Sequence, residues 1–257
     1  CHVQRLRIEK TAQGQVCRGV EFSGGGQSWV ADAAHETLLC AGAIGSPQIL
    51  QLSGVGPAAL LQSHQLPVTL DLPGVGENLQ DHLQLRMAFK VQGVKTLNTM
   101  ANSWLGKMQI GLEYALNRSG PMSMAPSQLG AFTRSDPSQS SANIQYHVQP
   151  LSLNKFGEPL HPFPAFTASV CNLRPTSRGH VRIASTDPSA APVIAPNYLS
   201  TAEDRKVAAD SLSLTRRIVA APALQRYSPE EFMPGPQFRT DEELAHAAGN
   251  IGTTIFH

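Results

Sequence analysis

The stretch that decides the fold reads GAIGSPQILQLSGVGP and runs from Gly42 to Pro57. Before it stands a short continuous apolar run, residues 37–41, which is typical of a strand covered on both faces. After the glycine turn, Ser46 is a good helix cap and Pro47 suits the first helical position. The aliphatic residues that follow predict a helix that stops at Gly54. The stretch therefore predicts a buried strand, a tight turn and a helix in succession.

On the N-terminal side of this stretch the pattern changes to alternation of apolar and polar residues. Residues 3–8 and 16–22 alternate in this way, and a third short run, residues 29–31, follows three glycines at 24–26. Strand-like runs around a glycine turn predict a hairpin. On the C-terminal side, residues 73–76 read PGVG and predict another tight turn.

From residue 85 onward, strand-like segments are separated by long polar or proline-rich loops, and one helix is predicted from about 103 to 116. This order predicts an antiparallel sheet with a helix rather than a further strand–helix–strand unit. The strand-like segments are residues 85–91, 144–148, 166–173 and 180–183.

Two capping-box patterns predict helices near the C-terminal end. Ser200 and Glu203 begin a helix to about residue 220, and Thr240 and Glu243 begin a short helix ended by Gly249. The core-facing stripe of the first helix is expected to be Val207, Leu214 and Ile218.

Composition excludes several classes of function. The chain has 257 residues and a net charge of +1, and its basic residues are scattered, so electrostatic binding to nucleic acid is not expected. No apolar stretch reaches the roughly 18 residues of a membrane-spanning helix. The four cysteines have no zinc-type spacing and do not make a disulfide scaffold. Together with the absence of a signal-peptide pattern, they favour a cytoplasmic enzyme.

Most familiar catalytic motifs are absent. Gly42-x-x-Gly45 and Gly74-x-Gly76 do not complete GxGxxG between a strand and a helix, and no lysine of a P-loop follows them. There is no GxSxG elbow for a serine hydrolase. The nine histidines include no HExxH pair, so most are interpreted as hydrogen-bonded or exposed rings. His147 lies in a strand pattern where a role in a substrate pocket is conceivable. His257 is distinguished by its sequence context.

Five segments together resemble the glucose-methanol-choline (GMC) family of oxidoreductases. The stretch from Gly42 to Pro57 closely resembles a signature of that family. Four flanking segments agree with it: CHVQRLRI at residues 1–8, PGVGENLQDH at 73–82, RPTSRGHVRIASTDPSAAPVIAPNYLS at 174–200 and TTIFH at 253–257.

The resemblance implies a flavoenzyme that oxidises a primary or secondary alcohol to an aldehyde or ketone with FAD. In that reading His257 is the catalytic base, since a neutral imidazole accepts a proton near physiological pH. Val3, Ala41 and Gly42 resemble the family residues whose backbone lies beside the adenosine half of FAD. The expected partners are a small-molecule alcohol and an electron acceptor, either dioxygen or a quinone-type molecule. No metal site is expected.

The fold implied is of mixed α/β class, with part of a Rossmann-like FAD-binding domain and an antiparallel-sheet substrate-binding domain. We expect residues 1–82 to belong to the former and residues 83–257 to the latter, with the family's C-terminal region starting at about 166. The absence of GxGxxG and the final residue His257 predict that the chain is an internal piece of a longer protein.

Two other functions stay open at this point. Some relatives with this fold cleave cyanohydrins and use FAD only structurally, which would make the protein a lyase. The 257-residue chain by itself is expected to be a non-catalytic piece, because most FAD contacts and a second active-site residue are missing. The sequence distinguishes neither which alcohol is oxidised nor an oxidase from a dehydrogenase.

Overall fold

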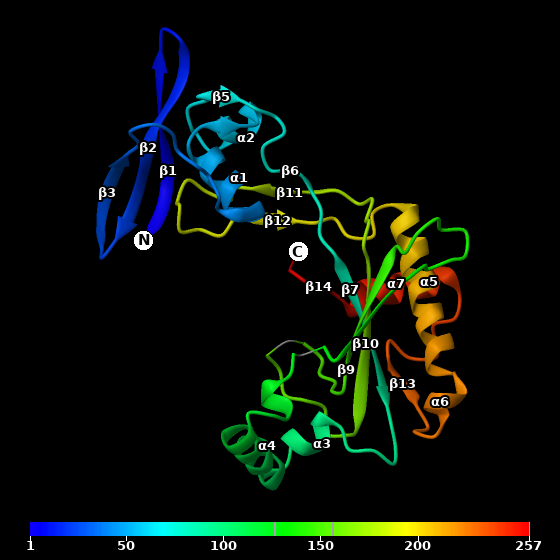
Figure 1. The fold of residues 1–257 in the computed structure, drawn as a ribbon. Coiled ribbons are helices and arrows are strands. Elements are labelled where there is room, and N and C mark those ends of the chain that lie inside the picture. Colours follow the sequence, from blue (N-terminus) through cyan, green and yellow to red (C-terminus); the bar gives the residue numbers. More distant parts are fainter. Residues whose placement is uncertain (126, 156, 257) are drawn as a thin grey trace. The chain divides into compact units, whose positions relative to one another are not determined.

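The computed structural model describes residues 1–125, 127–155 and 157–256. Contacts within the chain divide it into two compact units (Figure 1). Unit 1 contains Cys1–Gln80 and Ser177–Asn197, and unit 2 contains Asp81–Thr176 and the chain from Tyr198 onward. The predicted division into an FAD-binding and a substrate-binding domain concerns function, and it stays a prediction.

Unit 1 begins with an antiparallel sheet of β1 (His2–Thr11), β2 (Gly14–Gly24) and β3 (Gln27–Asp32). Gly25 and Gly26 form the turn between β2 and β3 with φ of 59° and 77°, which glycine adopts without steric cost. The predicted hairpin is therefore confirmed. At Gly19 the strands approach so closely that a Cβ would lie 1.9 Å from the carbonyl oxygen of Ala31.

The decisive stretch forms α1 (Gly42–Leu52), β4 (Val55–Gly56) and the start of α2 (Ala58–Ser63). The end of α1 is as predicted, with Gly54 at a φ of 80°. The predicted start was wrong. Ser46 does not cap the helix but accepts a hydrogen bond from the backbone N–H of Ala41 at 3.1 Å, so the helix begins at Gly42 and contains Pro47.

The predicted strand at residues 37–41 was also wrong. This segment has no regular structure, and the side chain of Leu38 is 74% exposed. A strand requires a hydrogen-bonding neighbour, and the described part of the chain provides none for these residues. An apolar run alone therefore did not suffice to form a strand here.

A buried glutamine joins α1 to the second sheet of unit 1, which contains β6 (Glu77–Leu79), β11 (Gly179–Arg182) and β12 (Val193–Ala195). Gln51 is fully buried. Its Nε2 donates to the carbonyl oxygens of Val75 and Val181 at 3.2 and 3.0 Å, and its Oε1 accepts from the N–H of Ile183 at 2.8 Å. A short parallel pair, β4 with β5 (Leu70–Asp71), completes the described sheets of this unit.

Unit 2 is built on an antiparallel sheet, as predicted, but the strand predicted at residues 180–183 is β11 and lies in the second sheet of unit 1. Its strand order is β13-β7-β10-β9-β8, and β14 also pairs with β7. The strands are β7 (Leu83–Lys90), β8 (Leu129–Thr133), β9 (Ile144–Gln149), β10 (Ala165–Asn172), β13 (Glu230–Met233) and β14 (Gly252–Thr254).

One face of this sheet is apolar and packs against α5 (Ala202–Val219) and α7 (Asp241–Ile251). Thr201, not the predicted Ser200, caps α5 by accepting from the N–H of Asp204. Of the predicted stripe, Val207 is buried and Leu214 partly buried, but Ile218 is 45% exposed. The capping box of α7 is confirmed, although the helix continues two residues past Gly249.

The remaining described helices of unit 2 lie on its connections. They are α3 (Leu97–Ala101), α4 (Trp104–Asn117), the 3₁₀ turn η1 (Pro121–Ser123) and α6 (Pro222–Gln225). The helix predicted at 103–116 is α4.

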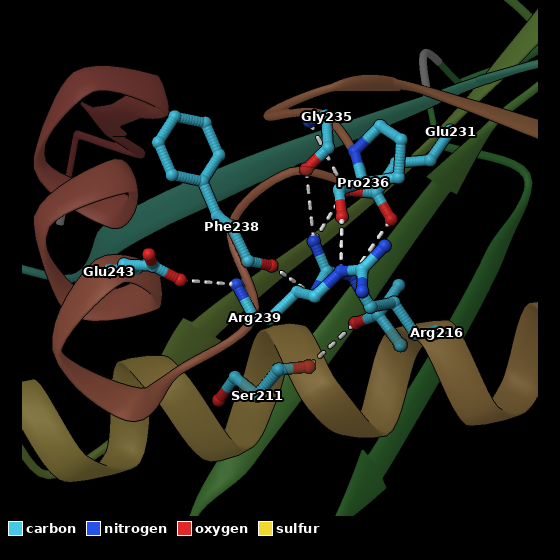
Figure 2. A network of polar contacts seen from close by, with 9 residues as sticks. Ser211, Arg216, Glu231, Gly235, Pro236, Phe238, Arg239 and Glu243 are labelled. Atoms are coloured by element: carbon cyan, nitrogen blue, oxygen red, sulfur yellow. Dashed lines mark hydrogen bonds and ion pairs between the residues drawn. The ribbon is translucent and has the colours of Figure 1, made fainter.

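A polar network fastens α5 to β13 and to the loop that leads to α7 (Figure 2). Arg216 of α5 donates to both carboxylate oxygens of Glu231 and to the carbonyl oxygens of Gly235 and Phe238. Glu231 also accepts from the N–H of Gly235 at 3.2 Å. A single side chain thereby fixes the path of the chain over residues 231–238.

Candidate active site

The second face of the unit 2 sheet is polar, although most of it is buried. In an antiparallel sheet, directly opposed residues point to the same face. The register places Arg86 of β7 opposite Ser169 of β10, and Ser169 opposite His147 of β9. Arg86 is 4% exposed and Ser169 is 1% exposed. The strand residues on either side of this row are apolar and face the helices.

Arg86 is the notable member of the row, because a cation is costly to bury. Its burial lowers the pKa of the guanidinium below its ordinary value, although an arginine side chain stays protonated in proteins. Proteins keep such a charge inside when it serves an ion pair or a site. Arg86 is therefore a functional candidate.

A cavity of about 430 Å³ lies against Arg86. Two short strands form its walls, since β13 pairs with β7 as far as Met233 opposite Ala88, and β14 resumes the pairing at Gly252 opposite Leu85. Arg86 therefore lies on β7 between the last residue paired with β13 and the first residue paired with β14. The cavity is lined by Arg86, Asn154, Lys155, Met233, Asn250, Ile251, Gly252, Thr253 and Phe256.

A buried network supports the rim of this cavity. Asn98 of α3 donates to the carbonyl oxygens of Ser152 and His161, at 3.0 and 2.9 Å, and accepts from the N–H of Ser152. The ring of His161 bonds to the hydroxyl of Ser152 and, at 2.9 Å, to Oδ1 of Asn154. Burial lowers the pKa of His161, which favours the neutral ring. His161 is thus a hydrogen-bonded structural histidine that orients a cavity residue.

The predicted base, His257, lies outside the described residues. The segment that leads to it is described: Gly252–Thr254 is β14, Thr254 Oγ1 accepts from the N–H of Phe256 at 2.9 Å, and Phe256 lines the cavity. His147, the other histidine considered for a substrate pocket, lies in the row of Arg86 with β10 between them.

The three predicted FAD-binding residues lie in unit 1. Val3 is half-buried on β1, opposite Phe22. Ala41 and Gly42 are exposed at the start of α1. Gly42 has a φ of 78°, and a Cβ built on it meets no atom within 4 Å. Small exposed residues leave the backbone open to a close approach, which fits the adenosine contact expected of them.

Sequence reasoning missed Arg86, Asn98 and Ser152. Arg86 is preceded by Leu85 in an alternating strand, a pattern that equally describes a solvent-facing charge. Asn98 and Ser152 stand 54 residues apart, and no local pattern connects them. The burial of alternate polar positions on β7 and β10 was the missing information.

Unit 2 thus has an antiparallel sheet with a polar, cavity-bearing face, and unit 1 contains the glycine turn. Residues 1–84 match the N-terminal domain of the GMC oxidoreductases, and residues 175–257 match their C-terminal domain. The chain belongs to the GMC oxidoreductase family, whose members are FAD-dependent.

Curated relatives support this assignment. The oxygen-dependent choline dehydrogenase of Burkholderia multivorans is 39% identical over 244 residues, which cover 95% of this chain and 43% of that protein. The oxygen-dependent choline dehydrogenase of Serratia proteamaculans is 42% identical over 227 residues, which cover 88% of this chain and 41% of that protein. The chain therefore spans less than half the length of these curated relatives.

Solved structures agree on the fold. A formate oxidase structure from Aspergillus oryzae RIB40 superposes with a TM-score of 0.88 at 22% identity, over 100% of this chain and 49% of that one. Pyridoxine 4-oxidase from "Mesorbium loti" superposes with a TM-score of 0.80 at 25% identity, over 99% of this chain and 45% of that one. The predicted fold class is thereby confirmed. Among the described residues, no helix combines the length and apolar character needed to cross a membrane.

Proposed function

We propose that the full-length protein oxidises a primary or secondary alcohol to an aldehyde or ketone with FAD. The observation that carries this proposal is the cavity against Arg86, whose wall is the segment leading to His257 in a chain that matches the GMC family at both ends. The curated relatives that carry the name choline dehydrogenase support the same class of reaction.

Each predicted residue has a part in this reaction. FAD, when bound, supplies the acceptor for the hydride that leaves the alcohol carbon. His257 accepts the hydroxyl proton, which gives the oxygen alkoxide character and makes loss of the hydride easier. Val3, Ala41 and Gly42 hold the adenosine half of FAD through their backbone. In this proposal residues 1–82 belong to the FAD-binding domain and residues 83–257 to the substrate-binding domain.

His257 provides the direct test in the full-length, flavin-loaded protein. His257→Ala and His257→Asn should slow anaerobic flavin reduction by an alcohol by roughly 100-fold or more, the range of a general base. His246→Asn, at an exposed position of α7, is the matched control and should leave the rate within about twofold. An unchanged rate in His257→Ala would remove His257 from the mechanism. Product formation without flavin bleaching would instead indicate a lyase.

The electron acceptor and the compartment belong to this proposal too. We favour dioxygen, because the curated relatives carry the name oxygen-dependent, and oxygen uptake compared with reduction of a soluble quinone analogue separates the two acceptors. The four cysteines all lie in the described part of the chain and have free thiols, which supports a reducing, cytoplasmic location. Cell fractionation tests that location.

A further inference from the structure

A chain of hydrogen bonds connects the segment that leads to His257 with a carboxylate. The backbone N–H of Phe256 donates to Oγ1 of Thr254 at 2.9 Å. The hydroxyl of Thr254 hydrogen-bonds in turn to the phenol oxygen of Tyr198, and Tyr198 donates to the carboxylate of Asp81. Each hydroxyl accepts one hydrogen and donates one, so the chain runs in a single direction and ends on a group that only accepts.

A backbone contact holds the same segment from the side of β7. The N–H of Ile255 donates to the carbonyl oxygen of His82 at 3.3 Å, and Thr254 pairs with Leu83. Beyond this contact Phe256 has a φ of 70°, a left-handed conformation that a non-glycine residue keeps only where its surroundings impose it. The last described turn before His257 is therefore fixed both by side chains and by the backbone.

Tyr198 stands on a well-anchored part of unit 2. The next residue, Leu199, packs against the apolar core, and its carbonyl oxygen accepts from Arg205 of α5 at 2.8 Å. Burial and the carboxylate of Asp81 raise the pKa of Tyr198 above its ordinary value. The phenol therefore stays protonated and keeps its donor role across the physiological pH range.

The three side chains of the chain come from distant parts of the sequence. Asp81 lies in the segment 73–82, Tyr198 in 174–200 and Thr254 in 253–257, three of the five segments that resemble the GMC family. A satisfied polar chain adds little net stability, because water would bond to the same groups in the unfolded state. What it does provide is a unique geometry for the groups that it joins.

We infer that Tyr198 is a positioning residue for the proposed oxidation, because together with Asp81 it holds Thr254 and thereby the turn from which His257 projects. A general base must lie within about 2.6–3.2 Å of the proton that it removes, and a misplacement of about 1 Å slows a reaction strongly. Tyr198 acts in this role through the backbone alone. The inference rests on the proposed function, since it concerns the base of the same reaction.

The kinetic test uses the full-length, flavin-loaded protein with choline or 1-butanol, whichever reduces the wild-type flavin faster. Tyr198→Phe should slow anaerobic flavin reduction at saturating alcohol by roughly 10-fold or more and leave KM within about twofold, because orientation of the base matters in the transition state. Tyr227→Phe, which removes a hydroxyl bonded to the exposed Arg226, is the matched control and should stay within about twofold of the wild type.

Thr254 provides a second pair of variants with a built-in rescue. Thr254→Val keeps the shape of the side chain but removes the hydroxyl, and it should lose about as much rate as Tyr198→Phe. Thr254→Ser keeps the hydroxyl and should return to within about threefold of the wild-type rate. A purely structural role would lower Tm in the Val variant without this split between kcat and KM.

Hydrogen exchange gives a readout that needs no turnover. In the flavin-loaded protein without alcohol, the Phe256 amide should exchange at least about threefold faster in Tyr198→Phe than in the wild type, because Thr254 loses the group that orients its hydroxyl. The control Tyr227→Phe should leave that amide unchanged.

Each outcome then has one meaning. Flavin reduction at the wild-type rate in Tyr198→Phe would overturn the positioning role and leave the oxidation intact. Absence of reduction by any alcohol in the wild type would refute the proposed oxidation, and faster exchange at Phe256 would still support Tyr198 as the anchor of the turn. Equal exchange in the two proteins would overturn that anchor. If Tyr198→Phe does not retain flavin, the Thr254→Val and Thr254→Ser pair decides.

Discussion

The guanidinium of Arg216 binds both carboxylate oxygens of Glu231, with Nε and Nη2 each 2.8 Å from an oxygen. The two side chains are 25% and 9% exposed, so water screens the pair only in part. Because Arg216 also donates to two backbone carbonyls, its removal leaves Glu231 uncompensated and frees the chain at Gly235 and Phe238.

Arg216→Ala should therefore lower the free energy of unfolding by about 2–3 kcal/mol, somewhat below the range for fully buried pairs. Thermal unfolding of the full-length protein measures the change as a drop in Tm of several degrees. Arg217→Ala, one residue further along α5 and exposed, is the control and should shift Tm by less than about 1 °C. Equal shifts in the two variants would show that the pair contributes nothing beyond a surface arginine.

Gln51→Leu should destabilise unit 1, because it keeps the volume of the side chain but removes all its hydrogen bonds. The N–H of Ile183 and the carbonyl oxygens of Val75 and Val181 would lose their partner in a buried place. The expected cost is about 2–4 kcal/mol. Hydrogen exchange at the Ile183 amide should accelerate as well, whereas Gln62→Leu, exposed on α2, should leave it unchanged.

Gly76→Ala and Gly93→Ala separate backbone strain from steric overlap. Both glycines have positive φ, 84° and 69°. A Cβ on Gly76 would lie 2.1 Å from the carbonyl oxygen of Val181, whereas a Cβ on Gly93 meets nothing within 4 Å. Gly93→Ala should cost about 1 kcal/mol of strain. Gly76→Ala should cost at least about 2 kcal/mol more, and equal Tm values for the two would contradict the described packing.

Cys171 gives the fold a pH dependence in alkaline solution. Burial raises the pKa of its thiol from 9.0 to about 11. The native state therefore holds this proton more tightly than the unfolded state, so its stabilising contribution is present below pH 9. That contribution is lost as the pH rises from 9 to 11, and it amounts to about 2–3 kcal/mol.

Urea unfolding at pH 8, 9, 10 and 11 measures this loss by comparison with Cys171→Ala, in which the slope should be smaller. Iodoacetamide at pH 8 should alkylate the exposed Cys40 and spare Cys171. Equal labelling of the two cysteines in the native protein would contradict the burial of Cys171.

The 257-residue chain produced alone should purify poorly and without yellow colour. Its GxGxxG is missing, and Leu38, Val30 and Trp29 are 74%, 56% and 51% exposed. Exposed apolar groups of this kind promote aggregation. Absorbance near 450 nm of the purified chain, read against that of the full-length protein, measures the bound flavin. A soluble product with one flavin per chain would contradict this expectation.

Local patterns predicted the parts of the fold that local physics determines. Alternation gave β1 and β2, strand-like runs gave β7, β9, β10 and β11, and Thr240 with Glu243 gave the start of α7, whereas β8, β13 and β14 were not predicted. The prediction of a strand at residues 37–41 failed because an apolar run forms a strand only when a neighbouring strand hydrogen-bonds to it. The predicted start of α1 was wrong because the hydroxyl of Ser46 accepts a hydrogen bond from the N–H of Ala41 instead of capping a helix that begins at Pro47. The sequence does not distinguish these two arrangements.

The candidate site was less accessible to prediction than the fold. Resemblance supplied His257, Val3, Ala41 and Gly42, and their roles stay predictions. Arg86 emerged only from the register, because pairing with Ser169 and the arrival of β13 and β14 decide that its side of β7 is enclosed. Those partners come from distant parts of the sequence, and no window around Arg86 contains them.

One edge of β7 pairs with two strands, β13 and β14, and this has a consequence for folding during synthesis. Residues 83–90 leave the ribosome early, and β10 can pair with their first edge while translation continues. Their second edge waits for β13 and then for Gly252–Thr254, which are synthesised after the rest of the described sheet. An unpaired edge recruits other chains. Nascent protein is therefore most exposed to aggregation until this last strand is in place, and the wall of the cavity is the final piece of the sheet to form.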